Sequence, residues 1–134
     1  GERFALLTGA CEKVASPENR MACFKSIGWS FLEKTERTFA QSREQCATIA
    51  TVADRRGCLW GVSNAYADIG TKPGVIISEC ASERTESEQR ACYDGLFYAL
   101  KDRDADPFAK VCDSAPDDFC RTALEDFILA DTSL

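Results

Sequence analysis

Eight cysteines recur along this chain of 134 residues, and their spacing constrains the fold more than any other feature. They form four consecutive pairs, with eleven residues between the partners in the first three pairs and seven in the fourth. The first members of successive pairs follow one another after 35, 34 and 32 residues. A period of this length is typical of helical repeat proteins. The sequence therefore predicts a single domain, 1–134, built from four units at about 1–35, 36–70, 71–104 and 105–134.

The residues after the second cysteine of each pair predict a helix. Three positions after it the side chain is always small, and the next residue is aliphatic. Apolar residues four and eight positions after the cysteine lie on one helical stripe, which is the spacing of a buried face. The small residues are Ser26, Gly61, Gly95 and Ala123, and the apolar ones are Ile27, Val62, Leu96, Leu124, Phe31, Tyr66, Leu100 and Ile128. We expect each small residue to let a neighbouring helix approach closely.

Turn and capping residues divide each unit into two helices. Thr85 and Glu88, for example, match a capping box, in which the two residues satisfy each other's backbone amides at a helix start. The predicted fold is all-α, with four antiparallel helix hairpins of about 34 residues stacked in one domain. The expected helices are 2–15, 18–34, 37–51, 55–69, 73–83, 86–101, 107–113 and 117–130.

The hairpin plan also predicts how the cysteines pair. In each unit the first cysteine lies near the end of one helix and the second near the start of the next, and an antiparallel hairpin brings these two ends together. The simplest set is Cys11–Cys23, Cys46–Cys58, Cys80–Cys92 and Cys112–Cys120. Reduced thiolates that bind zinc or copper are the alternative, but the spacings fit neither metal well. An even number of cysteines at this density indicates an extracellular or periplasmic protein.

Composition excludes several functions. The chain contains no histidine, so catalysis that depends on histidine and zinc sites that use it are ruled out. Its 16 basic and 22 acidic residues leave a net charge of -6, which argues against nucleic acid as a partner. No apolar run is long enough to span a membrane. We expect a protein without cofactors that is not an enzyme.

Two short segments resemble known exported proteins. Arg20 to Phe24, with the sequence RMACF, and Gln89 to Asp94, with the sequence QRACYD, resemble the RLxCYD pattern of cysteine-rich proteobacterial exported proteins. The period and the helix pairs resemble tetratricopeptide and Sel1-like repeats. These resemblances imply a bacterial exported protein made of helical hairpins.

Two clusters are candidate binding sites. Asp102, Asp104 and Asp106 imitate the first ligands of a calcium-binding EF-hand loop, but Pro107 stands where that loop needs glycine. We favour linker residues for Asp102 and Asp104 and a helix cap for Asp106, with a weak cation site as the alternative. Aromatic residues on the second helices are candidates for a ligand groove or a protein interface, with core packing as the alternative. They are Trp29, Trp60, Tyr93, Phe97 and Tyr98.

Charge is distributed unevenly along the chain. Residues 1–56 carry a net charge of +2, residues 57–100 carry -3 and residues 101–134 carry -5. An elongated stack with ends of opposite charge can associate head to tail. We therefore expect an interaction or structural subunit of an extracellular or periplasmic assembly, which binds a protein partner or itself and could form a head-to-tail polymer. The alternatives are a secreted carrier of an apolar small molecule and an acidic inhibitor of a basic enzyme.

Overall fold

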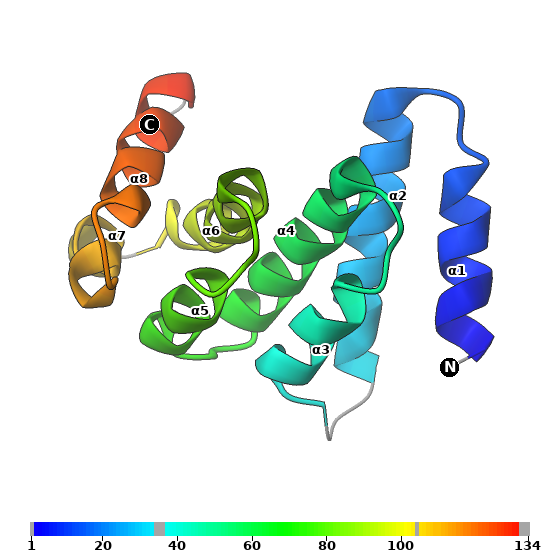
Figure 1. Cartoon of the computed structure of the whole chain (residues 1–134). Coiled ribbons are helices and arrows are strands. Elements are labelled where there is room, and N and C mark those ends of the chain that lie inside the picture. The colour runs from blue at the N-terminus through cyan, green and yellow to red at the C-terminus, as the bar shows by residue number, and fades with distance from the viewer. Residues whose placement is uncertain (1, 34–36, 104, 132–134) are drawn as a thin grey trace.

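The computed structural model describes residues 2–33, 37–103 and 105–131, without the side chains of residues 2, 33 and 106. The chain runs from α1 at one end of the molecule to α8 at the other, as the colours in Figure 1 show. All regular elements of the described residues are helical, which confirms the all-α class. They are α1 (Glu2–Glu12), α2 (Pro17–Ser30), η1 (Phe31–Glu33), α3 (Phe39–Cys46), α4 (Val52–Asp68), α5 (Pro73–Cys80), α6 (Glu86–Leu100), α7 (Ala105–Ala109), η2 (Val111–Ser114) and α8 (Phe119–Ala130).

These elements form four successive hairpins, which we number from the N-terminus: α1–α2, α3–α4, α5–α6 and η2–α8. Each hairpin contains one disulfide, and the pairs are the ones that the spacing predicts. The Cα atoms of the paired cysteines are 5.5 or 5.6 Å apart, within the usual range for a disulfide. Every covalent cross-link therefore closes a short loop inside its own hairpin.

Capping residues explain where several helices begin. Ser16, Thr51 and Thr85 each accept a hydrogen bond from the amide three residues later, at the starts of α2, α4 and α6. The expected capping box at Thr85 is only half formed, because the Thr85 hydroxyl itself donates to the Glu88 carboxylate. A complete capping box lies instead at the start of α3, between Thr38 and Gln41.

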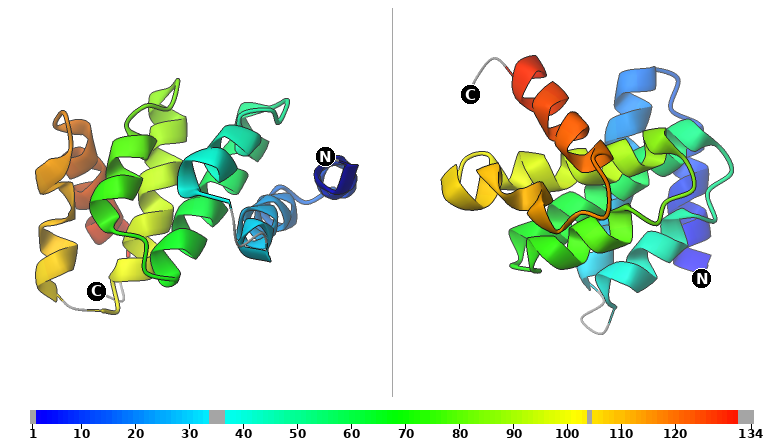
Figure 2. Two further views of the ribbon diagram at one scale, coloured as in Figure 1. Left: turned by 90° about the horizontal axis from the view of Figure 1, so that it is seen from below. Right: turned by 60° about the vertical axis from the view of Figure 1, so that its left-hand side comes forward.

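The second helix of each hairpin packs against the second helix of the next, so α2, α4, α6 and α8 succeed one another along the molecule (Figure 2). Glycines make the closest contacts. A Cβ atom at Gly61 of α4 would clash with the carbonyl oxygen of Lys25 in α2, and one at Gly95 of α6 would clash with that of Trp60 in α4. The predicted close approach at these two small residues is confirmed. Ser26, at the same position in α2, is exposed.

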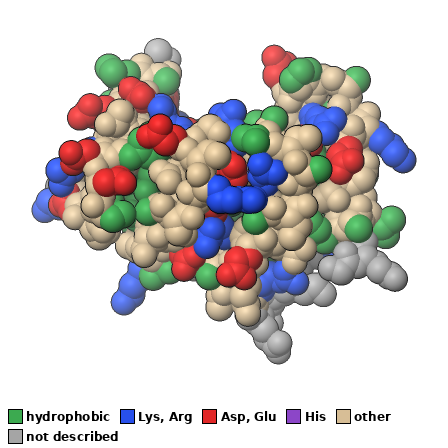
Figure 3. Space-filling view, in the orientation of Figure 1, with side chains coloured by type: hydrophobic (Ala, Val, Ile, Leu, Met, Phe, Trp, Pro, Cys, Tyr) green, Lys and Arg blue, Asp and Glu red, His purple; other side chains and the backbone are tan. Residues whose placement is uncertain are grey.

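The core lies between these helices. The residue directly after the second cysteine is fully or almost fully buried in the first three hairpins, where it is Phe24, Leu59 or Tyr93. The expected buried stripe is present except at Ile128, which is 43% exposed. The equivalent residues Phe31 and Tyr66 pack on Phe4 and Phe39, in the first helices of their own hairpins. Figure 3 shows that charged side chains are spread over the face seen in Figure 1, with basic ones near its centre.

The fourth hairpin departs from the prediction. A single helix over 107–113 was expected, and that expectation is wrong. A five-residue helix, Ala105–Ala109, is followed by a turn of 3-10 helix, Val111–Ser114. The disulfide between Cys112 and Cys120 closes a loop four residues shorter than the others, with a sequence separation of 8 against 12. Cys112 lies in this 3-10 turn, which is wound more tightly than an α-helix. We attribute the tighter winding to the shorter loop.

Candidate functional site

The structure separates the five aromatic candidates into two groups. Tyr93 and Phe97 have no exposed surface and pack on each other and on aromatic residues of α8. For these two residues the core-packing alternative holds. Tyr98 is 51% exposed and Trp29 is 38% exposed, while Trp60 is partly buried. The three of them form the aromatic part of a surface on α2, α4 and α6.

This surface combines aromatic rings with cations. The Nζ atom of Lys25 lies 4.1 Å from the centroid of the Trp60 ring, and the centroid of the Tyr98 ring lies 5.6 Å from that of Trp60. The Nζ atom of Lys101 lies 4.7 Å from the Tyr98 ring. Amines placed over aromatic faces in this way are attracted by the ring quadrupole. We call Lys25, Trp29, Trp60, Tyr98 and Lys101 the aromatic surface.

Trp29 is bound to the scaffold by its indole nitrogen. Its Nε1 atom donates to the side-chain oxygen of Asn64, at 3.0 Å, and the amide nitrogen of Asn64 donates to the carbonyl oxygen of Gly95, at 3.0 Å. This chain of hydrogen bonds links α2, α4 and α6. Trp29 therefore has a structural role at one edge of the aromatic surface, and its exposed ring face remains open to solvent.

Asp94 of α6 lies beside this surface in an unusual environment. Burial raises its pKa to about 6, against the opposing effects of Arg90 and Arg56. The Oδ1 atom accepts no hydrogen bond from the described residues, and the nearest Arg90 nitrogen lies 3.9 Å from it. Arg90 also pairs with Asp126 of α8, at 3.0 Å. Asp94 is thus a carboxylate that titrates near neutral pH within a mixed charge cluster.

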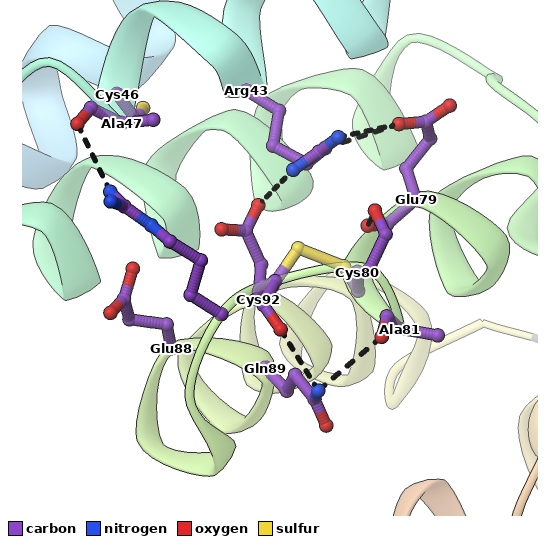
Figure 4. Close-up of polar contacts among 12 residues, drawn as sticks. Arg43, Cys46, Ala47, Glu79, Cys80, Ala81, Glu88, Gln89 and Cys92 are labelled. Carbon is purple, nitrogen blue, oxygen red and sulfur yellow. Dashed lines mark hydrogen bonds and ion pairs between the residues drawn. A yellow bond between two sulfur atoms is a disulfide. The ribbon is translucent and has the colours of Figure 1, made fainter.

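A second polar cluster lies between the second and third hairpins (Figure 4). Arg43 of α3 donates to Glu79 at 3.1 Å and to Glu83 at 2.5 Å, and so links α3 to the end of the third hairpin's first helix. Burial raises the pKa of Glu83, and the nearby Arg43 opposes this effect. Gln89 donates to the carbonyl oxygens of Ala81 and Glu83, which lie in the connection between α5 and α6.

Arginines at one repeated position join successive hairpins. Arg20 and Arg55 both stand three residues before a second cysteine. Arg20 donates two hydrogen bonds to Asp54, at 2.9 and 2.7 Å, and Arg55 donates to Glu88 at 3.3 Å. Each acceptor stands four residues before the second cysteine of the next hairpin, and both are buried. We call these two ion pairs the arginine ladder.

The same arginines also hold the connections inside their own hairpins. Arg20 donates to the carbonyl oxygen of Glu12, at 2.8 Å, and Arg55 donates to that of Ile49, at 2.8 Å. Gln89 occupies the equivalent position in the third hairpin and makes the same kind of bond to its connection. It has no acidic residue to bind in the fourth hairpin, where Pro116 stands at the acceptor position. The ladder therefore ends at the third hairpin.

The remaining candidates concern metals. All eight cysteines are in disulfides, and the described residues contain no group of three metal-ligating side chains. Asp102 is exposed, while Asp104 and the side chain of Asp106 lie outside the described residues. The expected helix cap at Asp106 is wrong, because α7 already begins at Ala105 and its backbone includes residue 106. Two of the three carboxylates of the EF-hand-like cluster thus lie outside the described residues, and the weak cation site stays a prediction.

The sequence reading missed the arginine ladder and Lys25. The signal for the ladder was present, since an arginine three residues before one second cysteine is matched by an acid four residues before the next. The position of Lys25 over Trp60 depends on how two helices cross, which the alignment of units alone does not specify.

Comparison of the chain with protein-family models, with curated proteins and with solved structures gives no match. Across the described part of the chain, no helix has both the length and the apolar character needed to cross a membrane. Four disulfides in a domain of this size are typical of an oxidising environment.

Proposed function

We propose that this protein is a non-catalytic interaction or structural subunit of an extracellular or periplasmic assembly. Its role is to present a rigid surface to other protein chains. The observation that carries the proposal is that the buried carboxylates serve to join neighbouring hairpins. Asp54, Glu83 and Glu88 each pair with an arginine from the preceding hairpin. These carboxylates hold one hairpin to the next, as in a scaffold.

The aromatic surface supplies a contact region for such a role. Tryptophan, tyrosine and arginine are enriched among the residues that dominate protein interfaces. Tyr98 and Trp29 are exposed on helices that the glycine contacts and disulfides hold firmly. A rigid aromatic side chain loses little conformational entropy on binding, which favours affinity. We assign partner binding to this surface.

The disulfide pattern also bears on the carrier alternative. Carriers of apolar molecules tend to use cross-links between distant helices to hold a cavity open, whereas here each disulfide stays within one hairpin. This pattern favours the assembly function over the carrier. An inhibitor that docks through its acidic surface would bind a cationic partner in a salt-sensitive manner, which distinguishes it in binding experiments.

The test begins with protein isolated from its own source under mild conditions. We expect native mass spectrometry to find species heavier than 14.7 kDa that contain further protein chains. Tyr98→Ala should weaken retention of those chains about 10-fold, since truncating an interface anchor costs more than about 1 kcal/mol. Val75→Ala, on an exposed side chain of α5, is the matched control and should retain them.

Two results would contradict the proposal. One is a 14.7 kDa species that carries a bound compound of small mass, which would identify a carrier. The other is an enzymatic activity that one carboxylate substitution abolishes while the fold is kept.

A further inference from the structure

Three sides of each second helix are used inside the molecule. One side carries the second cysteine and the residues four and eight positions after it, and this side faces the first helix of the same hairpin. The residues eight positions after the cysteine show the contact, since Phe31 packs on Phe4 and Tyr66 packs on Phe39. The disulfides also join the two helices on this side. It is therefore closed to a partner.

Two further sides face the neighbouring hairpins. The residues one and five positions after the second cysteine face the next hairpin, as Tyr93 and Phe97 of α6 do when they pack on aromatic rings of α8. The residues one position before and three positions after the cysteine face the preceding hairpin. On α4 these are Gly57 and Gly61, where added Cβ atoms would clash with α2. In the middle of the molecule these two sides are closed as well.

The fourth side carries the residues two positions before, two positions after and six positions after the second cysteine. Because successive residues of an α-helix turn by about 100°, these residues lie on the side opposite the first helix. We call them the outer row. Its members are partly buried or exposed, apart from Asn64. On α2, α4 and α6 the outer row includes Lys25, Arg56, Trp60, Arg90, Asp94 and Tyr98.

Members of the outer row contact one another across these three helices. The Lys25 amine lies over the Trp60 ring, and the Tyr98 ring lies beside that of Trp60. Arg56 and Arg90 stand one turn closer to the starts of α4 and α6. The outer row therefore extends the aromatic surface toward the hairpin connections and adds a group of charges to it.

Asp94 is influenced by charges from all four second helices. Burial raises its pKa to about 6, and Asp126 of α8 acts in the same direction. Arg90 on its own helix, Arg56 of α4 and Lys25 of α2 act in the opposite direction. The cluster thus holds three cations against two carboxylates, whereas the chain as a whole carries a net charge of -6. A cationic cluster on an acidic protein directs anionic groups to that place.

Two of the cations are not paired inside the chain. Neither Arg56 nor Lys25 takes part in an ion pair between the described residues. The Nε atom of Arg56 also donates no hydrogen bond to them. Burial lowers the pKa of the Lys25 amine, against the opposing effect of Asp94. A carboxylate from outside the chain would form charge-assisted hydrogen bonds with both cations.

We propose that the outer row binds an acidic segment of a partner protein, whose carboxylates pair with Arg56 and Lys25 and whose neighbouring apolar side chain packs on Trp60 and Tyr98. This inference rests on the proposed function and specifies the chemistry of the partner. It also differs from the inhibitor alternative, which binds a cationic enzyme. Asp94 competes with the partner's carboxylates for the same cations, so binding is strongest when Asp94 is protonated.

Calorimetric titration with two synthetic peptides tests the preference for an acidic segment. One peptide has two glutamates on either side of a tryptophan, the other has glutamines in their place, and both have blocked ends. At pH 5.5 the glutamates remain ionised, because their pKa is about 4.3. We expect the acidic peptide to bind at least about 10-fold more tightly than the glutamine peptide, since it alone supplies charged acceptors.

Matched arginine variants locate the binding site. Arg56→Gln should weaken binding of the acidic peptide about 10-fold. Arg121→Gln removes the same charge from an exposed position of α8 outside the outer row, and it should leave the affinity almost unchanged. Circular dichroism should show the same helix content in both variants. Equal weakening by the two variants would overturn the inference, because it would show a response to net charge alone.

The pH dependence tests the competition by Asp94. Binding to the wild type should weaken about 10-fold between pH 5.5 and pH 7.5, as the Asp94 carboxyl ionises near pH 6. Asp94→Asn should bind the acidic peptide equally tightly at both pH values. A merely structural role for Asp94 would not remove the pH dependence. An Asp94→Asn variant that binds no better than the wild type at pH 7.5 would contradict the competition.

Two further results would overturn the inference. One is a wild type that binds neither peptide, and the other is equal affinity for both peptides. If other protein chains are still retained through Tyr98 in either case, the acidic partner is wrong and the proposed function stands. If no chains are retained either, the proposed function fails as well.

Discussion

Asp94 shows how a single carboxylate can oppose the stability of the fold. Its pKa is raised from 3.8 to about 6, chiefly by burial, so the folded state binds its proton more tightly than the unfolded state does. Stability from this group is therefore fully present below about pH 4 and is lost as the pH rises through about 6. The charge cluster around Asp94 does not fully compensate for the cost of its burial.

We accordingly predict that Asp94→Asn stabilises the protein at pH 8. A pKa shift of this size would correspond to about 3 kcal/mol, and partial exposure of the side chain reduces the expected gain to about 1–2 kcal/mol. Urea unfolding at pH 4 and pH 8 measures the effect, with Asp102→Asn on an exposed side chain as the control. A variant that is less stable than the wild type at pH 8 would show that Asp94 is stabilised as a charged group.

The arginine ladder gives the opposite case, in which a buried charge is paired. The Glu88 side chain is 1% exposed and that of Arg55 is 14% exposed. We predict that Glu88→Ala lowers the free energy of unfolding by about 3 kcal/mol, since it leaves a largely buried guanidinium without its counter-ion. The double variant Glu88→Leu with Arg55→Met should lose much less. Urea unfolding measures the free energy of unfolding of each variant. Equal losses in the single and the double variant would argue against an ion pair between Glu88 and Arg55.

At the scale of the helices, the glycines decide how closely neighbours pack. We predict that Gly61→Ala destabilises the protein by about 1–3 kcal/mol, because its methyl group meets the backbone of α2, which must move aside. Gly9→Ala is the matched control, since a Cβ there has nothing within 4 Å. It should stabilise the protein by about 0.5–1 kcal/mol through helix propensity alone. Thermal unfolding of the two variants should shift in opposite directions, and a shift in the same direction would contradict the role given to Gly61.

The sequence predicts most helices well because they carry two independent signals, the apolar stripe and the capping residues. The limits of α2, α4 and α6 lie within a few residues of the expected ones for this reason. The expected helix 107–113 failed because only Pro107, a cysteine and the supposed cap Asp106 marked it, and none of these reports how a shorter loop bends the chain. A local sequence pattern predicts a helix only where residues close in the chain also determine the geometry of that helix.

At the scale of the whole molecule, burial depends on what lies next to each hairpin. Phe97 and Tyr98 are neighbours on α6, yet the first is fully buried and the second is 51% exposed. Apolar character does not separate them, and only the packing of α8 on one side of α6 does. For the same reason Ser26 and Gly61, which occupy equivalent positions, are exposed and buried respectively. The sequence predicts the scaffold better than the surface that the scaffold presents.

The disulfides, finally, join cysteines that follow one another in the chain and never cross. When a polypeptide enters an oxidising compartment with its N-terminus first, each thiol meets its native partner before the next pair arrives. We therefore expect oxidation in order of arrival to give the native set without a disulfide isomerase. The order of the cysteines thus also encodes the order in which the protein can be assembled.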